Sequence, residues 1–519
     1  MRLSREAIEE CVRVLEALSA DRGELAYVEL ELRNRLLTAA GRVSRPERTE
    51  QRLLSREVRR KEKRDVRETD RAILARAGIR QKRLEPVFAT PYRPSALADG
   101  GGGSFESNRS SAAPLIGDPS EDTAELPPLN VARSCYVCKA RCTRMHSFYD
   151  QMCGECGDFN YAKRSQTADL RGRVALITGA RVKIGYQAAI MLLRAGARVI
   201  VTTRFPRDAA ERYARENDFA DWSDRLQIYG LDLRHSPSVE AFAAALGRSE
   251  PRLDFMLHNA CQTVRRPSGF YRHLMEGELA PLHELPRGTS RLLEGYEALR
   301  SEASRTLTDG ERASPALGIH AAPALSQVAL AVEDLDASPA LFPVGALDAD
   351  LQQIDRRSIN SWRLPLDQVG TVELLEVQLV NAIAPFLLNA RLKALMTKER
   401  TDDKHIVNVS AMEGQFYRRF KTDKHPHTNM AKAALNMMTR TSAPDYARDG
   451  IFMNSVDTGW VTDEDPIHIA ERKTRETGFQ PPLDIVDGAA RIVDPIFDGL
   501  NTGRHLWGQF LKDYRPTSW

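Results

Sequence analysis

The clearest pattern of apolar positions begins at Val174. Four consecutive apolar residues, Val174–Ile177, are typical of a parallel strand that is covered on both faces. Thr178 and Gly179 end this run, and apolar residues then recur at helical spacing through residues 184–195. From residue 170 almost to the C-terminus, strand-like and helix-like patterns alternate. This alternation predicts the α/β class, with a doubly wound parallel sheet.

The N-terminal segment, residues 1–88, follows a different pattern. It is rich in Arg, Glu and Leu and nearly free of glycine, and apolar residues recur at helical spacing through residues 8–18 and 25–36. A third, highly charged helix is predicted between residues 47 and 76. Its charges alternate in sign, which is more typical of a solvated helix face than of a nucleic-acid-binding surface. We interpret residues 1–88 as a charged helical region that serves as an interaction or oligomerisation arm.

The composition changes again on both sides of a cysteine cluster. Residues 89–130 contain a GGGG run, several Ser and Pro and few large apolar groups, which predicts a flexible linker. Residues 131–165 hold the cysteine cluster, and residues 166–519 hold the α/β domain. Within that domain, residues 265–368 are rich in Ala, Leu, Pro and Glu. This stretch is too long for a simple loop, so we expect an inserted lid or subdomain.

Composition and charge exclude several classes of protein. The 519 residues are 42% hydrophobic and 28% charged, and the net charge of +3 gives no general reason to expect a nucleic-acid partner. We expect no apolar stretch long enough to span a membrane. The N-terminus mixes acidic and basic residues through its apolar positions, unlike a secretory signal. Five of the seven cysteines cluster together, which indicates a reducing compartment and a cytoplasmic protein.

The cysteine cluster contains two Cys-x2-Cys pairs separated by fourteen residues. This spacing allows four thiolates to close a tetrahedral site around one zinc ion. Four protein ligands leave no open position, so a structural zinc is favoured over a catalytic one. Cys142 and His146 lie between the pairs, and a Cys3His site is an alternative. The four predicted ligands are Cys135, Cys138, Cys153 and Cys156.

The cluster resembles a zinc ribbon or treble-clef finger, and its first half is similar to a RING finger. A RING requires eight ligands for two ions, whereas only six candidates occur here, so ubiquitin-ligase activity is not supported. The resemblance implies a finger that binds a protein partner.

Residues 170–262 and 372–514 resemble the short-chain dehydrogenase/reductase family, whose fold is Rossmann-type. The run TGARVKIG, residues 178–185, corresponds to the family's TGxxxGxG turn, with Lys183 in place of the second glycine. Backbone N–H groups at the start of the following helix would face a ligand phosphate. Lys183 either contacts the pyrophosphate or points to solvent with an ordinary backbone conformation, and we favour contact.

The resemblance implies NADP as the cofactor rather than NAD. The second strand ends at Arg204, where a guanidinium offers paired donors to the 2′-phosphate of NADP and a carboxylate would repel it. Arg181 and Lys183 add positive charge at the turn. The cofactor-binding residues implied in this way are Thr178, Gly179, Arg181, Lys183, Ile184, Gly185, Arg204, Asp232, Leu233, Asn259, Ala260, Lys432, Gly459 and Thr462.

Some of these positions match the family only in part. Asp232 matches the family's aspartate that binds the adenine amine. Residues 258–261 read HNAC where the family usually has NNAG. Gly459 and Thr462 fit the segment that covers the nicotinamide, although Asp457 stands at its proline position.

Three residues match the catalytic positions of the family. Asn381 corresponds to the helical asparagine that helps to hold a proton-relay water, and Ser410 to the serine that hydrogen-bonds the substrate carbonyl. Lys432 corresponds to the lysine that binds the nicotinamide ribose and lowers the pKa of the catalytic tyrosine. The resemblance therefore implies an enzyme that retains three of the family's catalytic residues.

The catalytic tyrosine itself is absent. Four residues before Lys432, on the same face of the predicted helix, the chain has Thr428. A neighbouring ammonium can tune a phenol to exchange a proton near neutral pH, whereas the pKa of a threonine hydroxyl is far too high. Tyr417, His425 and His427 lie in the same stretch, and each is an alternative proton donor.

Two functions are consistent with these residues. The first is an NADP-dependent oxidoreductase for a small-molecule carbonyl or alcohol, with Asn381, Ser410, Tyr417 and Lys432 as catalytic residues. The alternative is a non-catalytic dinucleotide-binding sensor or scaffold that recruits a protein partner through the finger and the helical arm. Thr428 favours the alternative, and the three retained family residues favour the enzyme. The sequence is compatible with a homo-oligomer and does not specify the substrate.

Overall fold

The computed structural model describes residues 3–91, 125–285, 288–306, 317–417 and 421–519. The chain divides into two compact units, residues 1–71 and residues 72–519, and each is described by itself. Most of the predicted linker, residues 92–124, lies outside the described residues.

The first unit is helical. Ser4 begins α1, because its side chain accepts a hydrogen bond from the Ala7 N–H, as an N-cap residue does. Neither α1 nor α2 contains a buried residue, so these two helices contribute no hydrophobic core among the described residues of this unit. The elements are α1 (Arg5–Ala20), the 3-10 helix η1 (Arg22–Tyr27), α2 (Leu30–Ser44) and α3 (Arg48–Ala75), whose last turn belongs to the second unit.

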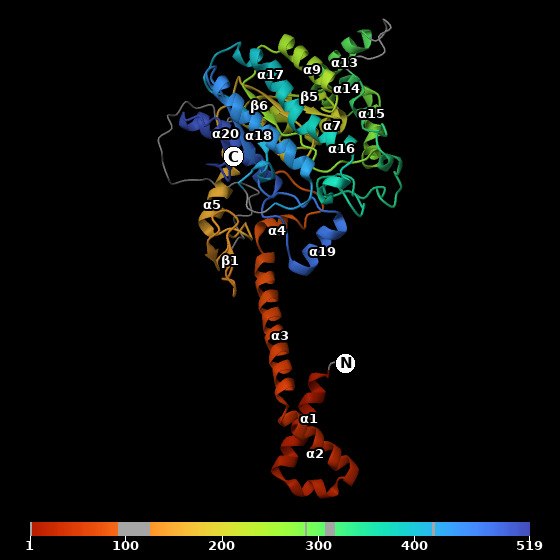
Figure 1. Ribbon diagram of the computed structural model, residues 1–519. Helices are drawn as coiled ribbons and strands as arrows, with labels where there is room; N and C mark the ends of the chain where they lie inside the picture. Colours follow the sequence, from red (N-terminus) through yellow and green to blue (C-terminus); the bar gives the residue numbers. More distant parts are fainter. Residues whose placement is uncertain (1–2, 92–124, 286–287, 307–316, 418–420) are drawn as a thin grey trace. The chain divides into compact units, whose positions relative to one another are not determined.

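An eight-stranded sheet forms the centre of the second unit (Figure 1). The strand order is β10-β9-β8-β7-β6-β3-β4-β5, and β10 alone among these strands is antiparallel to its neighbour. The order reverses between β3 and β6, which is the arrangement of the predicted doubly wound sheet. The strands are β3 (Val174–Thr178), β4 (Arg198–Thr203), β5 (Leu226–Gly230), β6 (Phe255–His258), β7 (Lys404–Ser410), β8 (Ile451–Asp457), β9 (Phe510–Lys512) and β10 (Arg515–Thr517).

Helices cover both faces of the sheet. Asn408 of β7 donates a hydrogen bond to Thr439 of α18 over 2.8 Å, whereas a Cβ added at Gly499 of α20 would lie 3.0 Å from the ring of His405. Because alternate strand residues point to opposite faces, α18 and α20 lie on opposite faces. Helix α6 packs with α20, and α9 packs with α17. The helices are α6 (Lys183–Arg194), α9 (Ser236–Ser249), α16 (Thr371–Gln378), α17 (Ala384–Thr397), α18 (Pro426–Ala447) and α20 (Ile485–Thr502).

The core lies between the sheet and these two helical layers. All five residues of β3 are buried, as the continuous apolar run of the sequence predicts. Ile177, Ile200 and Leu257 come from three neighbouring strands and are fully buried in one hydrophobic cluster. Burial of these side chains is the main force that holds the sheet and helices together.

The cysteine module is built into the second unit. Arg164, just after α5, forms buried ion pairs with Asp484 and Asp487 at the start of α20, at 2.7 and 2.8 Å. Tyr149 donates a further hydrogen bond to Asp487 over 2.5 Å. The module is therefore anchored on the α/β domain. Its elements are β1 (Arg133–Ser134), β2 (Arg141–Cys142) and α5 (Gly154–Lys163), next to α4 (Gly78–Lys82).

The described parts of the insertion, residues 265–368, form short helices up to Leu325 and then turns with short 3-10 helices. Phe270, Tyr271 and Phe342 of the insertion pack against Phe205, which follows β4. The insertion thus reaches the end of a central strand. Its helices are α10 (Ser268–Tyr271), α11 (Met275–Leu279), α12 (Thr289–Leu292), α13 (Glu294–Thr306), α14 (Leu317–His320) and α15 (Ala322–Leu325). Three further helices lie elsewhere in the domain: α7 (Pro206–Ala214), α8 (Phe219–Trp222) and α19 (Ile467–Thr477).

One helical run, Thr371–Thr397, is long and apolar enough to cross a membrane by length and composition. The expectation that no stretch approaches this length is therefore wrong. The same test is passed by core helices of soluble proteins. This run contains the buried Asn381, whose side chain bonds the loop after β6.

Candidate functional site

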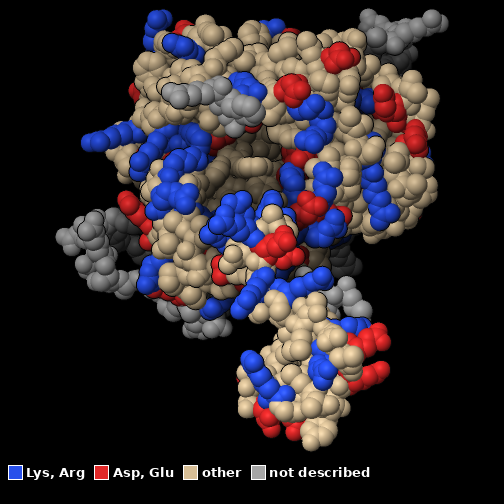
Figure 2. Space-filling view, turned by 60° about the horizontal axis from the view of Figure 1, so that its bottom comes forward, with Lys and Arg blue, Asp and Glu red and all other residues tan. Residues whose placement is uncertain are grey.

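A cavity of about 1250 Å³ lies at the carboxyl ends of the central strands. Figure 2 shows a hollowed face of the second unit with Lys and Arg side chains around it. Parallel strands of a doubly wound sheet form their ligand crevice at this edge. The predicted site residues that line it are Gly179, Arg181, Lys183, Ile184, Arg204, Asp232, Leu233, Asn259, Ala260, Asn381, Ser410, Lys432, Gly459 and Thr462.

The glycine turn between β3 and α6 is closely packed. A Cβ added at Gly179 would lie 2.7 Å from Ala260 Cα, and one added at Gly185 would lie 2.3 Å from Asn259 Nδ2. Thr178 Oγ1 accepts a hydrogen bond from the Ala260 N–H over 3.1 Å, and Asn259 Nδ2 donates to Gly179 O over 2.9 Å. Thr178 and Gly185 therefore hold the turn rather than line the cavity.

Lys183 has a left-handed backbone conformation, with φ of 57°. An ordinary conformation, one of the two alternatives from the sequence, is thus wrong. A non-glycine residue in this region costs about 1–2 kcal/mol. The Lys183 Nζ lies 3.9 Å from Asp350 of the insertion. Lys183 therefore reproduces the backbone of the missing glycine and adds a cation to the wall of the cavity.

The two arginines predicted to favour NADP, Arg204 at the 2′-phosphate and Arg181 at the turn, differ in their surroundings. Arg181 is buried and paired with Asp208 at 2.6 Å. Burial alone would raise the pKa of Asp208, but Arg181 and Arg212 lower it. Arg204 donates a hydrogen bond to the Tyr271 hydroxyl over 2.6 Å and lies 4.5 Å above that ring. Arg204 forms no carboxylate ion pair within the described ranges, which leaves its charge available to an anion.

Asp232 is buried and bound to Arg234, whose Nη2 lies 2.7 Å from Asp232 Oδ2. Although burial alone would raise the pKa of Asp232, the hydrogen bonds from Arg234 lower it. Arg234 also pairs with Glu376 of α16 at 2.9 Å. Asp232 is therefore ionised and held in a fixed position at the wall of the cavity.

Asn381 lies in a π-helical turn, Leu379–Ile383, between α16 and α17. Its Oδ1 accepts from the Gln262 N–H over 2.7 Å, and its Nδ2 donates to Gln262 O over 3.2 Å. Such π-turns are frequent at functional sites because they shift one side chain out of the helical register. Here the amide of Asn381 fixes the loop after β6 at the cavity.

Ser410 and Lys432 meet at the end of β7. The Lys432 Nζ donates to the carbonyl of Val409 over 2.7 Å, and Ser410 Oγ donates to Asn436 over 2.6 Å. Both residues are buried and both line the cavity. Lys432 and Asn436 lie one helical turn apart on α18, so this helix holds both groups at the strand end.

Thr428 occupies the position of the family's tyrosine and contacts His425. Thr428 Oγ1 donates to the carbonyl of His425 over 2.7 Å and lies 3.2 Å from His425 Nδ1. The His425 ring stacks on Trp362 with centroids 3.8 Å apart. Both His425 and Trp362 line the cavity. Burial lowers the pKa of His425, while Glu413 acts in the opposite direction.

The structure does not bring Tyr417 to this group. Its side chain is half exposed, its hydroxyl lies 3.4 Å from Thr517 Oγ1, and it is not among the residues that line the cavity. His427 points elsewhere and lies 3.3 Å from Glu373. Of the three alternatives, His425 alone lines the cavity.

The segment after β8 closes another side of the cavity. Gly459 has a φ of 75°, and Thr462 Oγ1 donates to Glu464 over 2.6 Å. Asp457 is the register partner of Ser410 on the neighbouring strand. Burial raises the pKa of Asp457 to about 6, although Lys512 opposes the shift.

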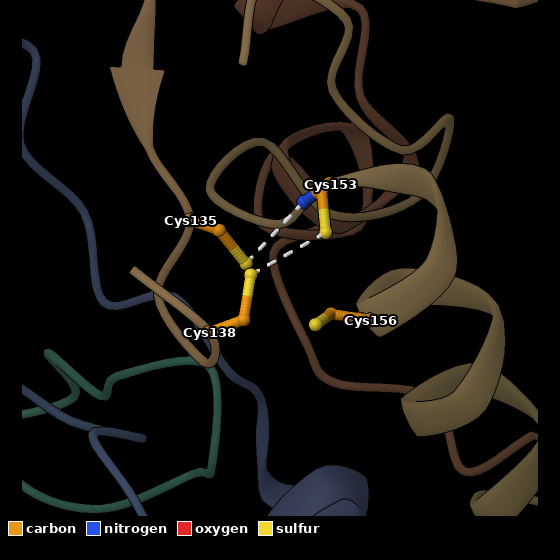
Figure 3. A group of neighbouring side chains, drawn as sticks. All are labelled: Cys135, Cys138, Cys153 and Cys156. Atoms are coloured by element: carbon orange, nitrogen blue, oxygen red, sulfur yellow. Dashed lines mark hydrogen bonds between the residues drawn. The ribbon is translucent and has the colours of Figure 1, made fainter. Parts of the chain in front are cut away.

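The four predicted cysteine ligands converge (Figure 3). Their sulfur atoms all lie within 4.8 Å of one another, and Cys138 Sγ and Cys153 Sγ are 3.8 Å apart. A tetrahedral site with Zn–S bonds of about 2.3 Å has S···S edges of about 3.8 Å. The thiolate set therefore fits a zinc ion. Burial alone would raise the pKa of Cys135, but backbone N–H groups lower it to about 7.

Cys142 and His146 do not join this group. Cys142 Sγ lies 3.7 Å from the Arg133 carbonyl, and His146 Nε2 lies 3.2 Å from Asp158. The Cys3His alternative has no support in this geometry.

Several cavity residues were not found from the sequence. Tyr136 and Lys139 come from the cysteine module, Tyr271 from the insertion and Trp362 from the segment before α16. In the sequence, none of them lies near a residue predicted to bind the cofactor or to act in catalysis. Only their tertiary placement brings them to the cavity.

Two stretches of this chain match known protein families. Residues 173–273 match the short chain dehydrogenase family, and residues 364–478 match the family described as Enoyl-(Acyl carrier protein) reductase. An uncharacterised protein, R665, of Acanthamoeba polyphaga mimivirus is 30% identical over 395 residues, which are 73% of this chain and 74% of the viral one. The two chains therefore belong to one family.

Shorter stretches resemble named enzymes. Bovine dehydrogenase/reductase SDR family member 13 is 41% identical over 104 residues, 19% of this chain and 27% of the bovine protein. Mouse retinol dehydrogenase 11 is 32% identical over 114 residues, 21% of this chain and 36% of the mouse protein. The match thus spans only about a third of these two relatives or less.

Solved structures show a distant likeness. The Pseudomonas aeruginosa RhlG/NADP active-site complex is 17% identical with a TM-score of 0.41, over 66% of this chain and 95% of that one. The NADPH-bound carbonyl reductase from chicken fatty liver is 17% identical with a TM-score of 0.39, over 67% of this chain and 100% of that one.

Proposed function

We propose that this chain, whose C-terminal region belongs to the short-chain dehydrogenase/reductase family, is an NADP-dependent oxidoreductase acting on a carbonyl or alcohol. The observation that carries the proposal is the single cavity shared by the glycine turn, Arg204 and Lys432. A cofactor bound by the glycine turn and Arg204 would extend toward Lys432. The substrate stays unspecified.

NADP is preferred because the Arg204 guanidinium follows β4 at the cavity and forms no ion pair with a carboxylate of the described residues. Its planar group can donate two hydrogen bonds to a phosphate. The Tyr271 hydroxyl holds the Arg204 guanidinium in place by accepting a hydrogen bond from it over 2.6 Å. Lys183 adds a second cation nearer the turn. When bound, the nicotinamide of NADP supplies or accepts the hydride.

His425 is the proposed proton-transfer residue in place of the missing phenol. The single hydrogen of Thr428 Oγ1 goes to the His425 carbonyl, so His425 Nδ1–H donates to Thr428 Oγ1. Thr428 thus engages only Nδ1, and Nε2 is the nitrogen that we assign to proton exchange. In carbonyl reduction, Nε2–H protonates the substrate oxygen as hydride adds to carbon, and the alcohol forms. In the reverse direction, Nε2 accepts that proton as hydride leaves.

Lys432 and Ser410 are the polar groups that we expect to act on the substrate oxygen during proton transfer. The Lys432 ammonium is held on the Val409 carbonyl, where its charge favours a developing negative charge on the substrate oxygen. Ser410 Oγ donates to Asn436, so the expected hydrogen bond from Ser410 to a substrate carbonyl requires its hydroxyl to turn from Asn436 to the substrate.

We also propose that the cysteine module binds one structural zinc. Four thiolates satisfy the tetrahedral preference of the ion and leave no open coordination position. Metal analysis after purification without chelators should find one zinc per chain, and a Cys156→Ser variant should lose it. Zinc-free wild type would contradict the assignment.

Fluorescence titration with NADPH and NADH, followed by turnover of a carbonyl panel, tests the function. We expect NADPH to bind more tightly than NADH, and NADPH oxidation to depend on both substrate and Lys432. Lys432→Ala should abolish turnover, whereas Lys398→Ala should not change it, because Lys398 directly follows α17 and does not line the cavity. Tight NADPH binding without turnover of any carbonyl would favour a non-catalytic sensor instead.

A further inference from the structure

Tyr136 of the cysteine module forms part of the wall of the cofactor cavity. It lies between Cys135 and Cys138, and its hydroxyl accepts a hydrogen bond from the Trp460 N–H over 3.0 Å. Trp460 belongs to the segment after β8 that lines the cavity with Tyr136. A residue of the metal module thus contacts the backbone that the family resemblance places over the nicotinamide.

The contact between Tyr136 and Trp460 leaves no space for a side chain at Gly459. A Cβ added at Gly459 would lie 3.1 Å from the Tyr136 hydroxyl and 2.4 Å from Leu483 Cδ1. Gly459 also has a positive φ of 75°, which side chains rarely adopt. Tyr136 and Leu483 therefore hold this turn from two sides.

The turn between Cys135 and Cys138 determines where Tyr136 lies. The Tyr136 N–H donates to Gln151 O over 2.7 Å, and the Cys135 N–H donates to Ala140 O over 2.9 Å. The adjoining strands β1 and β2 have only two residues each, so few backbone bonds support this turn. A metal held by four thiolates would supply the main constraint on it.

Hydrophobic packing connects the same module to the glycine turn. Cys135 and Met152 share one buried cluster with Val461 and Leu483, and Ile184 packs against it. Ile184 lies in the first turn of α6 and lines the cavity. The module therefore supports two walls of the cavity, one at Trp460 and one at Ile184.

We propose that Tyr136 is a positioning residue of the cofactor site and that it couples metal binding at the four cysteines to NADPH binding. The coupling rests on the proposed function, because it requires NADPH to occupy the cavity. Metal binding fixes Tyr136, Tyr136 fixes the Gly459–Trp460 turn, and the fixed turn binds cofactor. Linkage requires the effect to be reciprocal, so NADPH must tighten zinc binding by the same factor.

Two titrations on the full-length protein measure the coupling. The first compares the Kd of NADPH for zinc-loaded and zinc-depleted protein by fluorescence. The second measures zinc affinity by competition with a chromophoric chelator, with and without saturating NADPH. We expect zinc to tighten NADPH binding about tenfold and NADPH to tighten zinc binding by the same factor.

Tyr136→Phe separates the hydroxyl contact from folding of the module, because it keeps the ring and all four cysteines. We expect one zinc per chain, NADPH binding weakened about three- to tenfold, and a coupling factor reduced toward one. Tyr149→Phe is the matched control. It removes another phenol of the same module, but one that bonds Asp487 outside the cavity. Its NADPH affinity and coupling should equal those of wild type.

Each result decides one question. If Tyr136→Phe keeps wild-type NADPH affinity and coupling, or if Tyr149→Phe loses coupling to the same degree, the positioning role of Tyr136 is overturned. If zinc-depleted protein remains folded by circular dichroism and binds NADPH as tightly as loaded protein, the coupling is overturned. Failure of zinc-loaded wild type to bind NADPH contradicts the proposed function itself.

Discussion

Two arginines that look equivalent in the sequence have different surroundings. Arg181 is held in a buried ion pair with Asp208, whereas Arg204 contacts the hydroxyl of Tyr271 and the rings of Tyr271 and Phe205, which are all uncharged. A guanidinium already neutralised by a carboxylate has little charge left for a phosphate. If the chain binds NADP as proposed, we expect selectivity for the 2′-phosphate to depend on Arg204.

Replacing Arg204 by Ala should weaken NADPH binding about ten- to hundredfold, because a charged hydrogen bond contributes about 1.5–3 kcal/mol. Binding of NADH, which lacks the 2′-phosphate, should change less than threefold. Parallel fluorescence titrations with the two cofactors measure both values. Equal losses for NADPH and NADH would show that Arg204 supports the pocket without recognising the phosphate.

His425 has the strongest local signs of a functional role. Its φ of 43° is left-handed, and its ring is held between Trp362 and Thr428. Backbone strain of this kind is retained where the surroundings enforce it, often at active sites.

His425→Gln should lower kcat about 10²- to 10⁴-fold, the usual contribution of a general acid or base, with little change in the Kd of NADPH. Burial lowers the pKa of His425, Glu413 opposes this and His427 adds to it, so the ring is neutral at pH 7. Alcohol oxidation should therefore be constant above pH 7 and fall as the pH drops below this pKa. Stopped-flow rates across pH measure the profile, and a Gln variant with wild-type kcat would remove His425 from the mechanism.

At the scale of elements, the turn between β3 and α6 depends on the absence of a Cβ at Gly185. The nearest atoms to such a Cβ are Asn259 Nδ2 at 2.3 Å and Gly179 O at 2.5 Å. One of them is backbone, so the turn has to move to accept a side chain. The start of α6, which would face the cofactor phosphate, moves with it.

Gly185→Ala should abolish measurable NADPH binding and destabilise the fold by about 1–3 kcal/mol, the usual cost of overpacking. Gly247→Ala is the matched control, because Gly247 lies within α9 and has no atom within 4 Å of an added Cβ. It should raise the free energy of unfolding by about 0.5–1 kcal/mol. Urea denaturation compares the two. A Gly185→Ala protein as stable as wild type would contradict the close packing.

The neighbouring ends of β7 and β8 place Ser410 beside Asp457 in register. Asp457 is buried near Glu413, Asp513, Lys512 and Arg491, and its pKa rises from 3.8 to about 6. A raised pKa in the folded state means that the neutral form stabilises the fold. That contribution is complete below about pH 4 and is lost as the pH rises through 6.

Asp457→Asn should therefore stabilise the protein at pH 8 by about 1–3 kcal/mol and leave its stability unchanged near pH 4. The asparagine keeps the shape of the neutral carboxyl and buries no charge at either pH. Urea midpoints at the two pH values test this. An equal effect at both would show that the charge of Asp457 is not buried.

At the scale of the whole molecule, the chain consists of two units with different interiors. Helices α1 and α2 bury no residue, whereas the second unit holds the sheet, the cavity and the cysteine module around continuous cores. Residues 3–64 contribute no buried side chain. The second unit therefore has its own source of stability.

Removal of residues 1–64 should leave the Tm within about 2 °C of wild type. We expect the free energy of unfolding to change by less than about 1 kcal/mol, and such a change shifts the Tm of a domain of this size only slightly. The Kd of NADPH and the zinc content should also be unchanged. Thermal unfolding and fluorescence titration of the shortened protein measure these quantities. A large fall in Tm would show that the first unit supports the second.

The sequence by itself determined the strand at Val174, the glycine turn and the four cysteines, because each is set by residues close together in the chain. Continuous burial makes an apolar run, a turn requires glycine, and a thiolate site requires paired cysteines. Lys432 was identified only through the family resemblance of the short run that contains it, with Thr428 one helical turn before it.

Tertiary structure alone decided what surrounds those groups. It set Tyr417 outside the cavity, paired Arg181 with Asp208 and put Tyr136 of the cysteine module against Trp460. Arg181 and Asp208 are 27 positions apart, and Tyr136 and Trp460 are 324 positions apart. The periodicity of apolar residues gives no information about contacts between residues so far apart in the sequence. Packing between distant segments depends on the shape of the folded chain, so it cannot be found from local patterns.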